Sequence, residues 1–168
     1  RILGGEIPGE LATPLRRRRE RLVVTRPSSL ISPVIDGHVR SFFAYFGAGH
    51  YDAALQSGAM YRSDQRIRNI RFGNDTDNLY LQIDFTRLDD VALVIELGDP
   101  PANTITIPVE PDMECASAAR KTAGGQTHDI ACKIALRTVF EAAFPLRALG
   151  LEPGNTIRLT LRLVRGSL

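Results

Sequence analysis

The stretch Ile67–Phe85, which reads IRNIRFGNDTDNLYLQIDF, decides the fold of this chain. Its second half places apolar residues at every other position, namely Leu79, Leu81, Ile83 and Phe85. A period of two predicts a strand with one buried face in an antiparallel sheet. The residues before it, Gly73–Asn78, are all Gly, Asn, Asp or Thr, which are typical of tight turns. We therefore predict a β-hairpin whose second strand turns Leu81 towards the core.

Most of the remaining sequence consists of short apolar runs that predict further strands. We expect these strands at Leu22–Val24, His38–Phe46, Val91–Leu97, Asn103–Val109, Met113–Ala116, Ile130–Leu136, Val139–Phe144 and Ile157–Leu163. Helix is limited to short turns, one of them at Leu146–Leu151. So many short strands with so little helix predict an all-β fold, an antiparallel β-sandwich.

The segment Gly47–Asp64 shows no clear period and contains three glycines. We predict a long loop here, with a helical turn at Asp52–Gln56. Long ordered loops are uncommon in compact domains and often carry function. Candidate binding residues are therefore sought in and beside this loop.

The composition is that of a soluble globular protein, with 168 residues, 43% hydrophobic and 24% charged. No apolar run approaches the roughly 18–20 residues that a membrane span needs. We predict a connector with a possible first strand at residues 1–29 and a folded accessory domain at residues 30–168. Because the chain begins with Arg1 rather than Met and shows no signal peptide, we expect a piece of a longer protein. The compartment stays open, with the cytoplasm favoured.

The net charge of +2 is unevenly distributed along the chain. Residues 1–26 carry seven Arg and three Glu, whereas the rest carries fourteen basic and sixteen acidic residues. Phosphate backbones attract strongly basic surfaces, so we expect neither a nucleic-acid partner nor a membrane partner. The run Arg16–Arg19 could hold nucleic acid or an anionic membrane, but a solvated linker or helix end is the favoured interpretation.

The two cysteines, Cys115 and Cys132, are too few for a disulfide framework. They could form one bridge in a secreted domain, or serve as small apolar fillers in a cytosolic one. Their spacing is not that of a zinc site, and we predict no metal ligands among them.

Three motifs occur in an order that resembles a known family. They are Ile35–Gly37 near the start, Phe72–Leu81 in the middle and Phe140–Gly154 near the end. Together they resemble the family 9 carbohydrate-binding modules and the wider DOMON-like sandwiches. The segment Ser41–Arg66 is similar to the C-terminal accessory region of some bacterial family 57 glycoside hydrolases of the α-amylase/α-mannosidase type. The resemblance covers about Leu30–Val164.

This resemblance implies a DOMON-like sandwich, an immunoglobulin-like variant of the jelly roll. It also implies a non-catalytic carbohydrate-binding or accessory domain, with α-glucan as the favoured ligand and the catalytic domain of the same chain as a partner. The chain departs from the family pattern because it has no Trp, so any sugar would have to stack on Tyr or Phe. The alternative is a structural or interaction domain that packs against a catalytic domain without binding sugar.

The candidate ligand-binding residues are aromatic and polar side chains in and beside the predicted loop. They are Tyr45, His50, Tyr51, Tyr61, Arg62 and Asp64. Aromatic faces stack on the CH groups of sugars, and the polar groups would hydrogen-bond to hydroxyls. The alternative interpretation is that the aromatics pin the loop to the sheet, which is the commoner use of such residues.

We predict no catalytic residues and no cofactor. His50 and Asp52 could take part in acid–base chemistry with Asp64, but no nucleophile motif or fixed pair of carboxylates accompanies them. Asp75 and Asp77 could bind calcium through their oxygens. Capping of the turn that contains them is the favoured interpretation.

Overall fold

The structure of the protein is a computed structural model that describes residues 24–39, 42–53, 66–88 and 90–165. In this part of the chain, ten strands form one antiparallel sheet in the order β1-β2-β3-β4-β9-β8-β7-β6-β5-β10. The strands are β1 Val24–Thr25, β2 Gly49–Asp52, β3 Ile67–Asn74, β4 Asn78–Phe85, β5 Val91–Gly98, β6 Pro101–Val109, β7 Glu114–Thr122, β8 Thr127–Leu136, β9 Phe140–Pro145 and β10 Leu159–Arg165; two short 3-10 helices are η1 Phe42–Tyr45 and η4 Arg147–Leu149. The predicted all-β, antiparallel fold is confirmed.

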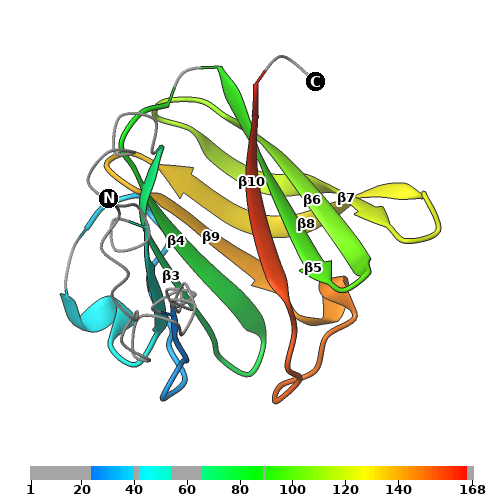
Figure 1. Ribbon diagram of the computed structural model, residues 1–168, viewed down its shortest axis with the longest axis horizontal. Helices are drawn as coiled ribbons and strands as arrows, with labels where there is room; N and C mark the ends of the chain where they lie inside the picture. The colour runs from blue at the N-terminus through cyan, green and yellow to red at the C-terminus, as the bar shows by residue number, and fades with distance from the viewer. Residues whose placement is uncertain (1–23, 40–41, 54–65, 89, 166–168) are drawn as a thin grey trace, which may run out of the picture.

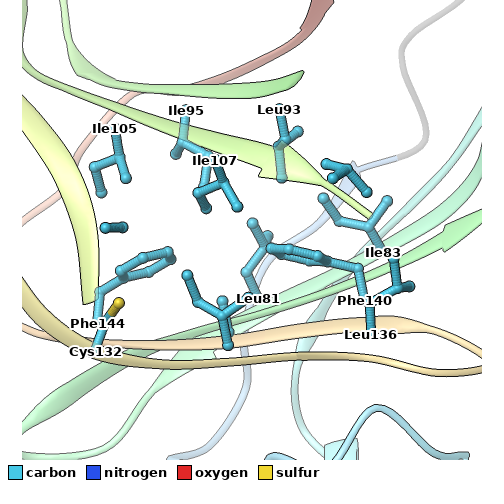
Figure 2. Close-up of a cluster of buried hydrophobic side chains, with 14 of the residues drawn as sticks. Leu81, Ile83, Leu93, Ile95, Ile105, Ile107, Cys132, Leu136, Phe140 and Phe144 are labelled. Atoms are coloured by element: carbon cyan, nitrogen blue, oxygen red, sulfur yellow. The ribbon is translucent and has the colours of Figure 1, made fainter. Parts of the chain in front are cut away.

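The sheet curls on itself around a single large core (Figure 1). Side chains from β5 and β6 face those from β4, β8 and β9 across this core, as Figure 2 shows for Ile95 and Ile105 opposite Phe144 and Leu81. Phe140 and Ile83 are fully buried, and Leu81 is 2% exposed. The inner face of the curled sheet is therefore the hydrophobic face that the alternation in the sequence predicted.

The predicted hairpin is confirmed as β3 and β4, with Phe72 opposite Leu81 in the register. The two faces of β4 are also as predicted, because Leu81 lies in the main core while Tyr80 covers the outer face of the sheet. Tyr80 is 5% exposed there and packs in a second, smaller cluster with Ile31 and Tyr45. This second cluster shows that the chain before β2 lies across the outer face of the sheet.

The strand predicted at His38–Phe46 is wrong, because its described part holds the 3-10 helix η1. Aromatic residues favour strands locally, but tertiary contacts decide the conformation here. Gly37 takes a positive φ of 74° and donates its amide to the buried Glu141 carboxylate. The chain that follows is thereby held over the sheet instead of joining it.

The long loop predicted at Gly47–Asp64 contains a strand, β2, which pairs with both β1 and β3. The pattern missed it because one inward position is Gly49, where a side chain cannot fit. A Cβ on Gly49 would lie 2.6 Å from the Phe72 ring. The helical turn predicted at Asp52–Gln56 lies mostly outside the described residues.

The edge strand predicted at Met113–Ala116 is the interior strand β7, which pairs with β6 and β8. Its sequence, ECASAARKT, lacks the β-branched and aromatic runs that mark a strand, so the pattern detected only its start. Ladder hydrogen bonds to two neighbours stabilise it instead. Strand β1 shares Val24 with the first strand predicted at Leu22–Val24, and the other two residues of that prediction lie outside the described residues. The boundary between a connector and a folded domain at residue 30 stays a prediction.

Candidate functional site

A cleft of about 780 Å³ lies between the two ends of the curled sheet. The strands β1–β3 form one wall and β10 with the residues before it forms the other; β10 stands at the front of the view in Figure 1. The described lining residues are Val24, Arg26, Tyr51, Ala53, Arg66, Ile67, Ile70, Phe72, Ile157, Leu159, Thr160, Leu161 and Leu163. Within the described ranges, β10 pairs only with β5, so these ten strands curl without closing into a barrel and leave the cleft between β10 and β1–β3.

Alkyl and aromatic side chains make up most of both walls. Leu159, Leu161 and Leu163 alternate along β10 and remain only partly buried, since no strand among the described residues pairs with the outer edge of β10. Phe72 and Tyr51 lie opposite, on β3 and β2. A concave surface of this size with a few polar groups at its margin is the usual form of a small-molecule site.

Tyr51 is the predicted site residue that the structure places in the cleft. It is half-buried against the main core, and burial, followed by the nearby charge of Asp52, raises its pKa above the ordinary tyrosine value. His50 precedes it on the same strand and therefore faces the outer side of the sheet. There its Nε2 lies 3.1 Å from Oδ1 of Asn69.

Tyr45 lies on the outer face of the sheet, away from Tyr51, and is only 6% exposed. Its hydroxyl donates a hydrogen bond of 3.2 Å to Oε1 of Glu141. Burial, and then the negative charge of Glu141, raise the pKa of Tyr45 well above its ordinary value. The structure thus does not bring Tyr45 and Tyr51 together in one groove. Tyr61, Arg62 and Asp64 lie outside the described residues.

Glu141 is a buried carboxylate on β9 that the sequence marked only as part of a motif. It is 2% exposed, and Oε2 accepts the backbone amides of Asp36 at 3.1 Å and Gly37 at 3.0 Å. Oε1 accepts the Tyr45 hydroxyl and, at 3.0 Å, Nε2 of Gln82. Four donors therefore satisfy one buried charge, and they tie the chain before β2 to the outer face of the sheet.

Arg71 continues this polar row by donating from Nη1 to Oε1 of Gln82 at 2.9 Å. The register aligns His50, Arg71, Gln82 and Glu141 across β2, β3, β4 and β9. Tyr45 and the backbone at Gly37 cover the Glu141 end of the row. This burial fits a structural role for the row better than contact with a ligand.

Asp75 caps the turn of the hairpin, as the favoured interpretation of the sequence expects. Oδ1 accepts the amides of Asp77 at 2.7 Å and Asn78 at 2.6 Å, and Oδ2 accepts the Tyr80 hydroxyl at 2.6 Å. Burial opposes ionisation, but these hydrogen bonds outweigh it and lower the pKa of Asp75. In the described part of the chain, no group of three or more His, Cys, Asp or Glu side chains is arranged to hold a metal ion.

We expect Asp75→Asn to destabilise the fold by about 1 kcal/mol at pH 7, because a charged acceptor is lost from the turn. The folded-state pKa lies below the unfolded value of about 3.9, so this contribution is complete above that pH and disappears as the pH falls through the folded pKa. Urea unfolding of the unchanged chain and of the Asp75→Asn variant from pH 7 to pH 2 measures the gap between their free energies of unfolding. Asp77→Asn, in the same turn, serves as the control with a smaller expected effect. A gap that stays constant down to pH 2 would contradict the assignment.

Both cysteines are free thiols in the structure. Cys132 is buried, and burial followed by the neighbouring Cys115 raises its pKa to about 11. Cys132 lies in the main core and Cys115 packs against it from β7. The arrangement corresponds to the predicted role of small apolar fillers.

Sequence reasoning missed most of the cleft, because the pattern of β3 is mixed and the alternation of β10 predicts only a strand with one apolar face. It also missed Arg66, Arg87 and Arg165, which stand at strand ends. The sequence did contain a signal for Arg66 and Arg87, because they flank the hairpin Ile67–Phe85 and the two ends of a hairpin lie side by side. The cleft itself has no local signal, because the lining residues of its two walls are 85 to 139 positions apart in the chain.

No helix among the described residues has the length and apolar character needed to cross a membrane. No protein-family model, curated protein or solved structure matches this chain significantly.

Proposed function

We propose that this chain is a non-catalytic binding domain, and that the cleft between β1–β3 and β10 holds its ligand. The observation that carries the proposal is the cleft itself, about 780 Å³ in volume and lined mainly by alkyl and aromatic groups. Ligand sites commonly have volumes of roughly 300–1,000 Å³ and predominantly apolar walls. Its polar lining consists of guanidinium and hydroxyl groups, which suit holding a ligand.

The resemblance to carbohydrate-binding modules supports an accessory role and a DOMON-like arrangement of the sheet. Two of its motifs meet in space, because the amides of Asp36 and Gly37 bond to Glu141. For an α-glucan, Tyr51 and Phe72 would be the stacking surfaces and Arg26 would bind hydroxyls. Most of both walls is aliphatic, however, and such walls match a hydrocarbon surface better than a row of hydroxyls.

The titration that tests this proposal uses the 168-residue chain, a neutral apolar fluorophore (N-phenylnaphthylamine) and maltooligosaccharides. We expect saturable fluorescence enhancement with the fluorophore. Leu161→Gln should weaken it about tenfold, because a polar group then faces the cleft. Val164→Gln, on the same strand but on an exposed position, is the matched control and should leave the affinity unchanged.

The outcomes separate the possible ligands. Fluorophore binding that Leu161→Gln weakens supports an apolar ligand. A heat of binding on titration with maltooligosaccharides, lost in the Tyr51→Ala variant, would show that the ligand is the carbohydrate that the resemblance implies and not an apolar molecule. If neither probe binds, the cleft is not a small-molecule site.

A docking role is the second candidate. Exposed apolar residues favour it on the outer cap, which is the described part of residues 31–48 and covers the outer face of the sheet. Phe43 is 77% exposed and Phe46 is 67% exposed on and beside η1, and Val34 is 72% exposed nearby in the chain. Large exposed apolar side chains that gather on one segment are typical of protein interfaces. Under this alternative, the cap packs against a catalytic domain, as the resemblance implies. Phe43→Ser with Phe46→Ser would then release that domain while leaving the melting temperature of this one unchanged.

A further inference from the structure

A second hollow of about 270 Å³ has one lining residue, Arg66, in common with the cleft. Its lining consists of Arg66, Arg87, Asp90 and Arg165. Three guanidinium groups and one carboxylate thus surround a small space. Among the described residues, the lining therefore carries three positive side chains and one negative side chain.

The topology explains why three arginines from distant parts of the chain meet there. Arg66 leads into β3 and Arg87 follows β4, and the amide of Thr86 bonds to the carbonyl of Arg66 at 2.8 Å. Arg165 ends β10 and lies opposite Val91 at the start of β5. The hollow therefore sits where the chain crosses from β4 to β5, between the two ends of the curled sheet.

The hollow and the cleft share one lining residue, Arg66. Ile67, the next residue, belongs to the apolar wall, and Leu163 lies two residues before Arg165 on the other wall. A ligand seated along the cleft would therefore pass from alkyl walls to a cluster of guanidinium groups. Arginine forks bind carboxylates and phosphates with paired hydrogen bonds.

We infer that the ligand of the cleft is an amphipathic anion, a long-chain carboxylate, whose hydrocarbon chain lies between β3 and β10 and whose carboxylate lies at Arg66, Arg87 and Arg165. This inference rests on the proposed function, since it needs the cleft to bind a ligand. It goes further by assigning the charge and the orientation of that ligand. Asp90, on the margin of the hollow, disfavours a second negative charge on the same head group.

The experiment compares decanoate with decanol as competitors of N-phenylnaphthylamine on the 168-residue chain. The two have the same number of carbon atoms, and the alkyl chain of decanoate is one carbon shorter, so tighter binding of decanoate reports the head group. We expect decanoate to bind about tenfold more tightly, as a charge-assisted pair allows. Added salt should weaken the binding of decanoate and leave the binding of decanol unchanged, because salt screens charge pairs near the surface.

Arg87→Gln and Arg165→Gln should each remove most of the preference for decanoate without changing the affinity for decanol. Both side chains are exposed, so these changes are compatible with folding. Arg68→Gln is the matched control, because Arg68 is exposed on β3, pairs with Asp84 and lines neither space. The Arg68→Gln variant should prefer decanoate over decanol to the same extent as the unchanged chain.

The outcomes distinguish this inference from the proposed function. Equal displacement by decanol and decanoate would overturn the assignment of charge, while the cleft would stand as an apolar site. A preference for decanoate that survives in both arginine variants would place the head group elsewhere and overturn the assignment of the hollow. If the fluorophore itself does not bind, the proposed function and this inference fail together.

Discussion

Replacing Glu141 with alanine is expected to lower the free energy of unfolding by about 3–5 kcal/mol. The carboxylate is 2% exposed and accepts four hydrogen bonds. Its removal leaves the amides of Asp36 and Gly37, the Tyr45 hydroxyl and the Gln82 amide without their acceptor. Each buried donor left unsatisfied costs about 1–3 kcal/mol, and the relief of burying one charge offsets part of the sum.

Urea unfolding, followed by circular dichroism, measures this effect. Glu152→Ala is the control, because Glu152 is exposed, and its effect should stay within about 0.5 kcal/mol. Glu141→Gln should also destabilise, since one of its two oxygens becomes a donor that faces other donors. Tyr45→Phe removes one hydrogen bond and should cost about 1 kcal/mol. A loss below about 1 kcal/mol in Glu141→Ala would show that the hydrogen bonds on the outer face contribute little to stability.

Phe140→Ala is expected to cost about 3–5 kcal/mol, because it empties the centre of the main core. Phe140 has no exposed surface, and its ring meets that of Phe85 edge to face with centroids 6.2 Å apart. Figure 2 shows it with Leu81, Ile83 and Leu136 on its own side of the core and with Leu93 of β5 on the opposite side. The loss combines the transfer of an aromatic ring to water with the cavity that it leaves behind.

Thermal and urea unfolding check this value, with Val34→Ala as the exposed control. Phe140→Leu retains most of the volume and should cost clearly less than the alanine variant. A small loss in Phe140→Ala would mean that β4 and β9 can close the cavity by moving together. Phe140 and Glu141 are neighbours on β9 and point to opposite faces of the sheet. The losses in the Phe140→Ala and Glu141→Ala variants therefore compare how much each face of one strand contributes to stability.

The main core was predictable because its pattern is local. In β4, β5 and β6, residues such as Leu81, Leu93 and Ile107 repeat with a period of two, and a strand turns such residues to one face. No long-range contact is needed to recognise this pattern. The turn at Asp75 was predictable for the same reason, since its hydrogen bonds join residues at most five positions apart.

The failures occurred where a contact distant in sequence overrides local preference. The aromatic segment around Tyr45 forms a 3-10 helix because Glu141, ninety-six positions away, holds its hydroxyl. Gly49 interrupts the apolar pattern of β2 because the Phe72 ring occupies the space of a side chain. Of the three predicted ligand residues that the structure describes, Tyr45, His50 and Tyr51, only Tyr51 lines the cleft, since His50 beside it points to the opposite face.

The sequence by itself determined the all-β class, the central hairpin and the inward face of most strands, because two-residue periodicity and turn residues act over a few positions. Only the tertiary structure decided that the sheet curls without closing, that Glu141 is buried among four donors, and that Arg66, Arg87 and Arg165 meet in a hollow that shares Arg66 with the apolar cleft. These features depend on the twist and curl of ten paired strands. Twist and curl accumulate over the whole sheet, so no local segment specifies them.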